Sequence, residues 1–371
     1  MPTIAIDARK YFDFGIGIYI QNLISSFSLL NNAFRFTLYV SPADRAKVAA
    51  PRDWELRDSP YGKYSPGEFL LFGRKALKEG IDLFHAPHYT LPSGLRGHSV
   101  VTIHDLIHLK FPQYFSQAQR AYARFMVGQA AHHAGAIITD SRNTKADLVN
   151  LFGVAEERVR VIHLGISDTF RPIEAARIEQ FRKRHDLAAP YLLFVGNVKP
   201  HKNIATLLRA FSDVRVRYPE LRLVFVGGKC LEDQALDQLA RDLGITAFIR
   251  DLGRISEEDV LGAYNAAEML VFPSLYEGFG FPVLEAMACG VPTVVSNGGS
   301  LPEVTGDASI VCDPLDSDSF VAAIETLLTD SARRTKLINL GRDRIHHFSW
   351  QKTATETLKV YEQVIAKCGA S

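Results

Sequence analysis

Long apolar runs are missing from this sequence of 371 residues. No stretch approaches the ~18 consecutive apolar residues that a membrane-spanning helix needs. The sequence does not open with a basic segment followed by an apolar core, so we expect no signal peptide. These absences predict a cytoplasmic protein, associated with the inner membrane only at its surface.

Cysteine is scarce, which limits disulfide and metal chemistry. The four cysteines show no metal-ligand spacing and favour a reducing compartment: Cys230, Cys289, Cys312 and Cys368. An Asp-x-Asp motif in a metal-binding setting is also lacking, because Asp316-Ser317-Asp318 stands at an expected helix start and is interpreted as a cap. We therefore expect no metal and no cofactor.

Net charge is nearly absent, at +1, which argues against nucleic-acid binding. The charge is nevertheless uneven, since residues 1–168 hold 19 Lys and Arg against 15 Asp and Glu. This surplus suits an anionic membrane surface or a phosphorylated acceptor. We expect peripheral association with the inner leaflet that weakens as salt rises.

Apolar strand-like runs alternate with amphipathic helical runs along the whole chain, and the length predicts two domains. The expected strands are 3–7, 35–40, 82–85, 99–104, 136–139, 159–163, 191–196, 222–227, 248–252, 269–272, 293–296 and 309–311. The expected helices are 16–30, 66–79, 116–133, 142–152, one that starts near Ile173, 203–217, 232–243, 257–267, 282–289, 316–329, 331–347 and 349–367. This alternation predicts the α/β class with two Rossmann-like, doubly wound parallel sheets.

The expected domain boundary follows a complete strand and lies near Ser167–Pro172. We expect an N-terminal domain over 1–168 and a C-terminal domain over 169–348, facing each other across a cleft. No strand remains for the final segment, so helix 349–371 is expected to pack back on the first domain. In such sheets ligands bind beyond the carboxyl ends of the strands.

The most informative motif is a glycine-rich loop bracketed by two carboxylates, Glu277 and Glu285. Gly278, Phe279 and Gly280 follow an apolar strand and precede a helix. A helix N-terminus suits a phosphate, and carboxylates accept hydrogen bonds from sugar hydroxyls. The loop therefore predicts a nucleotide-sugar pocket, although an isolated turn followed by an exposed helical glutamate would give the same letters.

A second junction lies at Gly196 and Asn197, which lead from strand 191–196 to helix 203–217. Lys202 falls just before that helix, where a cation opposes the helix dipole. A bound anion would remove the conflict, so Lys202 is interpreted as a diphosphate ligand. Lys199 is expected to be exposed.

Three more strand ends carry candidates. Gly15-Ile16-Gly17 lets backbone approach a ligand closely, but Ile20 breaks the dinucleotide pattern. His104, at the end of strand 99–104, is a candidate contact to sugar or acceptor, or else a capped loop histidine. The backbone of Arg254 and Ile255 is a candidate for reading the edge of a base.

Taken in order, these motifs resemble the retaining GT-B glycosyltransferases of family 4, which include bacterial mannosyl- and glucosyltransferases of cell-surface polysaccharides. The resemblance covers essentially the whole chain and is strongest over 191–306. It also includes the segments Gly15–Tyr19, Thr102–Asp105 and Val161–Gly165.

The resemblance implies roles for the motif residues. Glu277 and the backbone of 278–280 would hold the donor sugar and its phosphate, and Glu285 would bind the ribose hydroxyls. Lys202 would neutralise the diphosphate leaving group, with help from the Gly17 backbone. His104 would line the site near the attacking acceptor.

One position departs from the family pattern. Many members carry an arginine as a second diphosphate cation where this chain has Asn197. The diphosphate would then depend on Lys202, backbone amides and the N-terminus of helix 282–289, with Lys199 as a possible substitute.

The resemblance implies metal-independent hexosyl transfer with retention at the anomeric carbon. GDP-mannose is the first expectation for the donor, with UDP-glucose and other nucleotide-sugars left open. The acceptor is expected to be a saccharide or a lipid-linked oligosaccharide. A sugar-nucleotide epimerase and a non-catalytic nucleotide-sugar-binding subunit are the alternative functions.

Overall fold

The computed structural model describes residues 1–95 and 97–369. The chain divides into two compact units. Unit 1 contains residues 1–165 and the described residues from Phe348 onward, and unit 2 contains Ile166–His347. The sequence-based boundaries were 168/169 and 348/349. Ala370 and Ser371, which the expected N-terminal domain includes, lie outside the described residues.

Unit 1 is built on a seven-stranded sheet in the order β3-β2-β1-β4-β5-β6-β7, in which every neighbouring pair is parallel. Its strands are β1 Thr3–Asp7, β2 Arg35–Val40, β3 Glu55–Asp58, β4 Leu83–Ala86, β5 Ser99–Ile103, β6 Ala136–Thr139 and β7 Val159–Val161. Its helices are α1 Phe14–Leu29, α2 Gly73–Lys78, α3 Ile107–Lys110, α4 Gln117–His133, α5 Arg142–Phe152 and α14 Trp350–Gly369. A π-helical turn, η2 (Glu68–Phe72), precedes α2.

Unit 2 is built on a six-stranded sheet in the order β10-β9-β8-β11-β12-β13, again with parallel pairs throughout. Its strands are β8 Tyr191–Gly196, β9 Arg222–Gly227, β10 Ile249–Gly253, β11 Met269–Phe272, β12 Thr293–Ser296 and β13 Ile310–Cys312. Its helices are α6 Ala175–His185, α7 Ile204–Arg217, α8 Gln234–Asp242, α9 Glu257–Asn265, α10 Phe281–Ala288, α11 Leu301–Thr305, α12 Ser317–Thr329 and α13 Ser331–Ile345.

Short 3₁₀ turns join several of these elements. They are η1 Arg45–Lys47, η3 Pro112–Tyr114, η4 Glu156–Arg158, η5 Pro200–Lys202, η6 Cys230–Glu232, η7 Thr246–Phe248 and η8 Gly306–Ala308. Within the described residues, no helix has both the length and the apolar character that crossing a bilayer requires.

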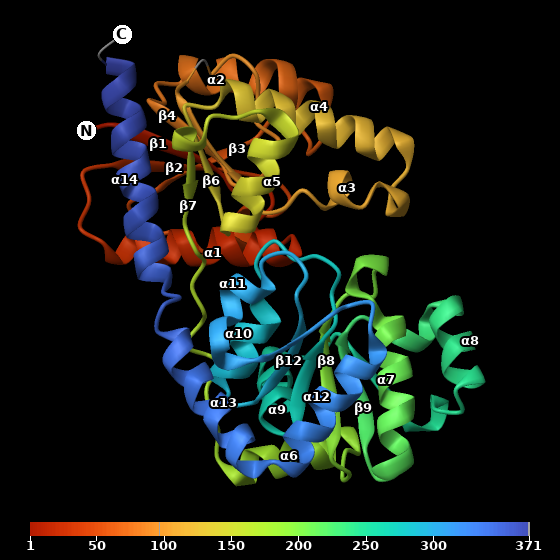
Figure 1. The fold of residues 1–371 in the computed structure, drawn as a ribbon. Coiled ribbons are helices and arrows are strands. Elements are labelled where there is room, and N and C mark those ends of the chain that lie inside the picture. The colour runs from red at the N-terminus through yellow and green to blue at the C-terminus, as the bar shows by residue number, and fades with distance from the viewer. Residues whose placement is uncertain (96, 370–371) are drawn as a thin grey trace. The chain divides into compact units, whose positions relative to one another are not determined.

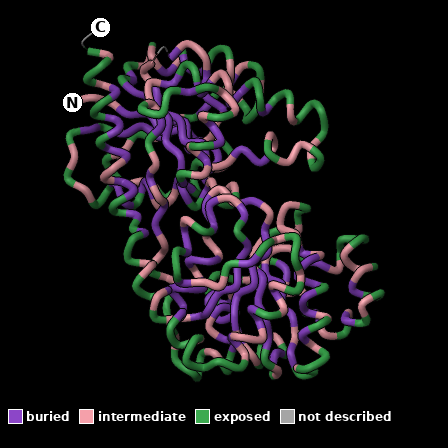
Figure 2. Tube along the Cα trace, viewed as in Figure 1, coloured by how far each residue is buried: buried purple, intermediate pink, exposed green. Residues whose placement is uncertain are grey.

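Each sheet lies between helices, and its central strands form the core of its unit (Figures 1 and 2). Strands β4, β5, β11 and β12 are buried at every position. Strands covered on both faces must be apolar throughout, which explains why their sequences show no alternation. The expected fold class, α/β with two Rossmann-like parallel sheets, is confirmed.

Strand β3 is the one strand that the sequence pattern did not predict. It reads Glu-Leu-Arg-Asp and lies at the edge of the sheet, paired only with β2 among the described strands. An edge strand needs little apolar surface, and charged side chains protect it from pairing with other chains. Apart from the expected helix 66–79, the boundaries of the expected strands and helices differ from the observed ones by at most two residues. The expected helix 66–79 is divided into η2 and α2.

The C-terminal helix α14 packs on α1, β4 and β5 of unit 1. Near its start, the backbone of Trp350 lies so close to Gly165 that a Cβ there would be 2.1 Å from the Trp350 nitrogen. Farther along, the Tyr361 hydroxyl lies 2.6 Å from Nδ1 of the buried His85. The helix therefore fills the core of unit 1 although the chain reaches it last.

Both sheets have a point where the strand order reverses. In unit 1 it falls between β1 and β4, and in unit 2 between β8 and β11. The loops after such neighbouring strands diverge to opposite sides and leave room for a ligand at the carboxyl edge. Each unit therefore offers one edge at which functional side chains are expected.

Candidate active site

In unit 2, the loops that leave β8 and β11 are tied together at the reversal point. The Leu275 amide donates to the His201 carbonyl at 2.7 Å. The side-chain amide of Asn203 donates to the Pro273 carbonyl at 3.2 Å and to the Pro314 carbonyl at 2.6 Å. These bonds fix the loop before α7 against the loop before α10.

This junction brings Lys202 and Glu277 into direct contact. The Lys202 Nζ lies 2.6 Å from Glu277 Oε1, and the side chains are 14% and 13% exposed. The same ammonium lies 5.1 Å from the centroid of the buried Phe272 ring. Lys202 belongs to the η5 turn just before α7, so Glu277 supplies the negative charge that a cation at this helix end requires.

The glycine-rich loop after Glu277 is shaped by its own backbone and by a second loop beneath it. Gly280 has φ 108° and directly precedes α10, where it offers no side chain to cap the helix. Ser300 supports the loop, because its amide donates to the Glu277 carbonyl at 3.1 Å and its hydroxyl to the Phe279 carbonyl at 2.8 Å. In the first turn of α10, Pro282 has no N–H group and the Val283 amide donates to the Gly280 carbonyl at 3.1 Å. This end of the helix therefore attracts an anion mainly through the helix dipole.

Sequence reasoning missed the supporting loop, which contains Gly298 and Gly299. A Cβ on Gly298 would lie 2.3 Å from the Ser274 carbonyl oxygen, and one on Gly299 would lie 2.5 Å from the Glu277 carbonyl oxygen. Gly299 also has φ 62°. Only glycine fits such positions. The Gly-Gly pair just after strand β12 was the signal that would have found this support.

Glu285 lies on α10 and contacts α9. Its Oε2 accepts a hydrogen bond from the Tyr264 hydroxyl at 2.6 Å. Burial raises the pKa of Glu285 to about 7, although the Tyr264 hydrogen bond acts in the opposite direction. Tyr264 is therefore the partner that orients this carboxylate. The described contacts of Glu285 do not join it to the Lys202–Glu277 pair.

The other unit 2 candidates lie along the same carboxyl edge. Gly196 ends β8 with φ 151°, and its carbonyl accepts from the Gly228 amide at 2.7 Å. Asn197 is exposed beside it. Arg254, exposed, and Ile255, half-buried, follow β10, which β9 separates from β8.

Lys229 is a cation at this edge that the sequence did not single out. It follows β9, and its Cε would lie 3.1 Å from a Cβ on Gly253. Its ammonium is paired with Glu232. Lys229 therefore lies between the loops that leave β8 and β10, close to the position where the family arginine is replaced by Asn197.

In unit 1, His104 follows β5 and is held at both ring nitrogens. Its Nδ1 lies 2.6 Å from Asp140 Oδ2, and its Nε2 lies 3.1 Å from the Pro87 carbonyl oxygen. Burial alone would lower the pKa of His104, but the charge and hydrogen bond of Asp140 outweigh it and raise the pKa. Because both partners are acceptors, the geometry favours the doubly protonated, charged ring.

Behind His104, the fully buried His85 stays neutral. Burial, together with the charge of His104, lowers the pKa of His85 to about 3. Its Nε2 lies 2.8 Å from the Thr102 hydroxyl, and Tyr361 reaches its other nitrogen. Asp140, the partner of His104, was missed by sequence reasoning, although its place directly after β6 was a usable signal.

Gly17 lies in the first turns of α1. Its amide donates to the Asp13 carbonyl at 2.8 Å, as in an ordinary helix. A Cβ here would lie 2.5 Å from the Tyr11 carbonyl oxygen. The close approach of the 10–11 backbone therefore explains this glycine. Among the described residues, no group of three His, Cys, Asp or Glu side chains is arranged to hold a metal ion.

Solved structures define the class of protein to which this fold belongs. Sucrose-phosphate synthase from Thermosynechococcus elongatus aligns with a TM-score of 0.79 and 22% identity, over 99% of this chain and 100% of that one. Anabaena Alr3699/HepE, in complex with UDP and glucose, aligns with a TM-score of 0.75 and 18% identity, over 97% and 98%. The fold is that of the GT-B glycosyltransferases.

The family follows from the sequence comparisons. Residues 176–344 match the model for Glycosyl transferases group 1, and residues 15–170 match Glycosyltransferase Family 4. The chain is 35% identical to O-antigen chain mannosyltransferase B of Escherichia coli over 285 residues, which are 76% of this chain and 74% of that one. This protein belongs to the family 4, group 1 glycosyltransferases, and is thus a transferase of the EC 2.4 class.

Proposed function

We propose that this protein transfers a hexose, with mannose as the first candidate, from a nucleoside-diphosphate sugar to a saccharide or lipid-linked acceptor. The transfer retains the anomeric configuration, requires no metal and contributes to surface-polysaccharide synthesis. The observation that carries the proposal is the Lys202–Glu277 pair at the reversal point of unit 2. It provides a cation and a sugar-binding carboxylate within one hydrogen bond of each other.

The pair suits the charge changes of glycosyl transfer. When the glycosidic bond to the diphosphate breaks, negative charge develops on the leaving group. In the proposed reaction, Lys202 and the dipole of α10 stabilise that charge, and stabilisation of this kind usually accelerates a reaction more than any other single effect. Before the donor binds, Glu277 holds the ammonium in position. Afterwards, Lys202 turns to the phosphate and Glu277 accepts from sugar hydroxyls.

The choice of donor and acceptor rests on the relatives. The Escherichia coli relative is named as a mannosyltransferase of the O-antigen chain, which favours GDP-mannose and a surface-polysaccharide acceptor. The Anabaena structure holds UDP and glucose, so UDP-glucose is the rival donor. The cationic surplus in residues 1–168 favours peripheral association with the inner leaflet. Sedimentation with anionic vesicles at low and high salt tests that association.

A transfer assay with candidate donors and extracted lipid-linked acceptors tests the proposal. Lys202→Ala should reduce turnover by about 100-fold, because a group that stabilises developing charge is lost. Glu277→Gln should also reduce transfer. Arg209→Ala, an exposed cation on α7, and Glu220→Gln, an exposed carboxylate, are the matched controls and should retain full activity.

NMR of the product establishes the anomeric configuration. A product with inverted anomeric configuration would contradict the proposed retention but would still be consistent with a glycosyltransferase. Isomerised donor without an acceptor would identify an epimerase, and donor binding without turnover would identify a binding subunit. Full transfer by both the Lys202 and Glu277 variants would overturn the assigned site.

A further inference from the structure

Unit 1 contains an aromatic hollow that none of the roles above uses. It lies between η2, the segment after β4 and the first half of α4, and has a volume of about 210 Å³. The side chains that give it its character are Tyr64, Phe69, Leu91, Tyr122, Phe125 and Met126. The hollow is larger than the ~150 Å³ engineered cavity that accepts benzene. Its size and lining therefore suit an apolar group.

The hollow is built from elements that hold one another in place. The rings of Phe69 and Phe125 meet edge to face with centroids 5.5 Å apart, and those of Tyr64 and Tyr122 are 6.3 Å apart. The Ser93 amide donates to the Phe69 carbonyl at 2.7 Å. Phe69 belongs to a π-helical turn, a form often found at functional sites. Phe125 and Tyr64 remain 57% and 51% exposed.

The Tyr64 side chain also contacts a buried cation, Lys10. Lys10 is 3% exposed and follows β1 at the reversal point of the sheet. Its ammonium donates a hydrogen bond to the Tyr64 hydroxyl and lies 3.9 Å from the ring centroid. Within the described residues Lys10 forms no ion pair, so its direct partner is a neutral phenol.

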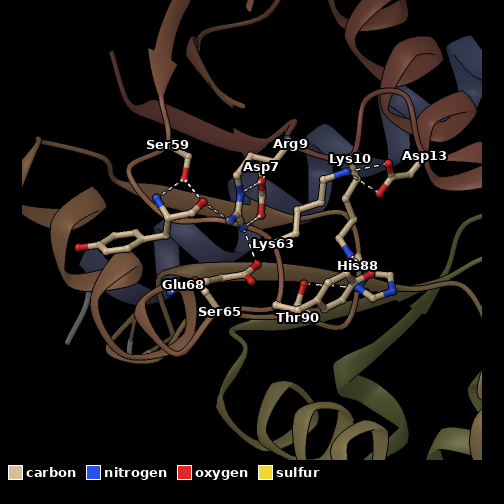
Figure 3. Close-up of polar contacts among 12 residues, drawn as sticks. Asp7, Arg9, Lys10, Asp13, Ser59, Lys63, Ser65, Glu68, His88 and Thr90 are labelled. Atoms are coloured by element: carbon tan, nitrogen blue, oxygen red, sulfur yellow. Dashed lines mark hydrogen bonds and ion pairs between the residues drawn. The ribbon is translucent and has the colours of Figure 1, made fainter. Parts of the chain in front are cut away.

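The neighbouring carboxylates are engaged elsewhere. Arg9 bonds Asp7 at 2.5 Å and Glu68 at 2.6 Å, and Lys63 bonds Asp13 at 2.7 Å. Lys10 is therefore the cation of this cluster (Figure 3) that can take a new anionic partner. Burial of its ammonium lowers the pKa of Lys10 to about 8. A partner with full negative charge would stabilise the ammonium more than a phenol does.

Tyr64 is held in a backbone conformation that favours glycine. It has φ 61°, although it is a bulky residue on an exposed segment. Backbone strain of this kind concentrates at ligand-binding and switch positions. Thr90 lines the hollow on the adjacent segment, and its hydroxyl lies 3.4 Å from His88 Nδ1. The Thr90 hydroxyl therefore lines the hollow itself, whereas Lys10 does not line it and is reached past the Tyr64 side chain.

We propose that this hollow binds a lipid phosphate, as the lipid-bearing part of the acceptor, with the hydrocarbon chain among the aromatic rings and the phosphate on Lys10. The inference rests on the proposed function for the identity of the acceptor. Tyr64 is the movable cover: its hydroxyl releases the ammonium when the phosphate arrives, and its ring stays beside the chain. Lys10 is a compact point charge, which suits a phosphate oxygen.

Calorimetry with the full chain and three probes tests the site. The probes are decyl phosphate below its micelle concentration, uncharged decanol and inorganic phosphate. Decyl phosphate should bind more tightly than either of the others. Phe125→Ala should weaken the binding of decyl phosphate and the binding of decanol by about tenfold each, because both lose a half-buried aromatic contact.

Changes at the polar end should act on the phosphate alone. Lys10→Met should reduce the affinity for decyl phosphate by at least about tenfold and leave the affinity for decanol unchanged. Tyr64→Phe should raise the affinity for decyl phosphate, because it removes the hydroxyl that competes with the phosphate for the Lys10 ammonium. Tyr114→Ala, an exposed aromatic outside the hollow, and Lys75→Met, an exposed cation on α2, are the matched controls.

Three outcomes would overturn the site. The first is that the Phe125 and Tyr64 variants bind decyl phosphate with the same affinity as the unchanged protein. The second is that inorganic phosphate binds as tightly as decyl phosphate. The third is that the protein binds only lipid vesicles, and the variants have no effect on the binding of monomeric decyl phosphate. If Lys10→Met does not fold, the Phe125 and Tyr64 variants decide the matter. Nucleoside-diphosphate binding, measured in parallel, should stay unchanged in every variant. If no donor supports transfer while the decyl phosphate pattern holds, the proposed function fails and the lipid-phosphate site stands.

Discussion

Single residues set the charge at both candidate centres. In unit 1, His104 is held between the Asp140 carboxylate and the Pro87 carbonyl, two acceptors that favour the charged ring. In unit 2, Lys202 and Glu277 neutralise each other, while Glu285 lies apart on Tyr264. The charge of His104 depends on one identifiable neighbour, Asp140, so a single substitution should change it.

Asp140→Asn should lower the pKa of His104, since burial then acts without the opposing carboxylate. Because the folded-state pKa is raised above 6.5, the pair stabilises the fold fully below pH 6.5, and that contribution is lost as pH rises through the raised value. The variant should therefore lose on the order of 1–2 kcal/mol at acidic pH and much less at alkaline pH.

NMR titration of the His104 ring and urea unfolding at several pH values measure both effects. Asp147→Asn, at a buried carboxylate that pairs with Lys110 instead, is the control for the His104 titration. An unchanged His104 titration in Asp140→Asn would refute the role of this carboxylate.

Glu285 should make nucleotide binding depend on pH. Its pKa of about 7 means that the carboxylate, the form that accepts from ribose hydroxyls, becomes dominant only above neutrality. Affinity for a nucleoside diphosphate should rise between pH 6 and 8. Tyr264→Phe should move the midpoint upward, because it removes a hydrogen bond that favours the ionised form.

The contribution of Glu285 to folding stability should fall as pH rises, whereas nucleotide affinity should increase. A carboxyl group whose folded-state pKa is raised stabilises the fold below its ordinary value of 4.5, and this contribution is lost as pH rises towards 7. Calorimetry of wild type against Glu285→Gln separates this carboxylate from the titration of the ligand's own phosphate. Equal pH slopes in the two proteins would show that Glu285 does not contact the nucleotide.

At the scale of elements, the glycine-rich loop is positioned by close packing of one loop on another. The 298–300 segment after β12 packs directly against residues 274–279. The contact is so close that any side chain larger than the hydrogen atom of glycine would clash at positions 298 and 299. The orientation of Glu277 and the start of α10 therefore depend on a segment that contributes no charged side chain.

Gly299→Ala tests this dependence. The new methyl group would lie 2.5 Å from the Glu277 carbonyl oxygen, so the loop must shift and nucleoside-diphosphate binding should weaken. Gly244→Ala is the matched control, because φ is 67° there and the added Cβ meets no atom of the described residues within 4 Å.

Both variants carry the same backbone strain of about 1–3 kcal/mol, but only Gly299→Ala carries the steric clash. Melting temperature and nucleoside-diphosphate affinity are measured for each. Equal loss of affinity in the two variants would mean that the 298–300 loop does not position the site.

At the scale of the whole molecule, the helix that completes unit 1 follows the residues of unit 2 in the sequence. Helix α14 supplies the buried side chains Trp350, Leu358, Tyr361 and Val364 to unit 1. The stability of the first unit therefore depends on residues that lie more than 180 positions later in the sequence than Gly165.

Tyr361→Ala should destabilise unit 1 by about 3–5 kcal/mol, which is the usual cost of truncating a buried aromatic side chain. The substitution also removes the hydrogen-bond partner of His85 Nδ1. Unit 2 should be unaffected. Hydrogen exchange, read peptide by peptide, should show faster exchange in β4 and β5 and unchanged exchange in β8 and β11. Glu362→Ala, one exposed position farther along the helix, is the control; uniform loss of protection in both units would contradict the prediction.

The sequence by itself determined the fold class, most of the elements and the order of the motifs along the chain. It did so because strands buried on both faces must be apolar throughout and because glycines and prolines mark the junctions. It did not predict β3, whose charged edge sequence carries no such pattern.

Only the tertiary structure decided which motifs meet. Lys202 and Glu277 are 75 positions apart, and His104 and Asp140 are 36 apart. Their contact follows from strand order, which places β8 beside β11 and β5 beside β6. Spacing along the chain does not encode that order, because neighbours in a parallel sheet are joined through helices of variable length. For the same reason the partners of Glu285 and Lys10 became visible only once the sheets were assembled.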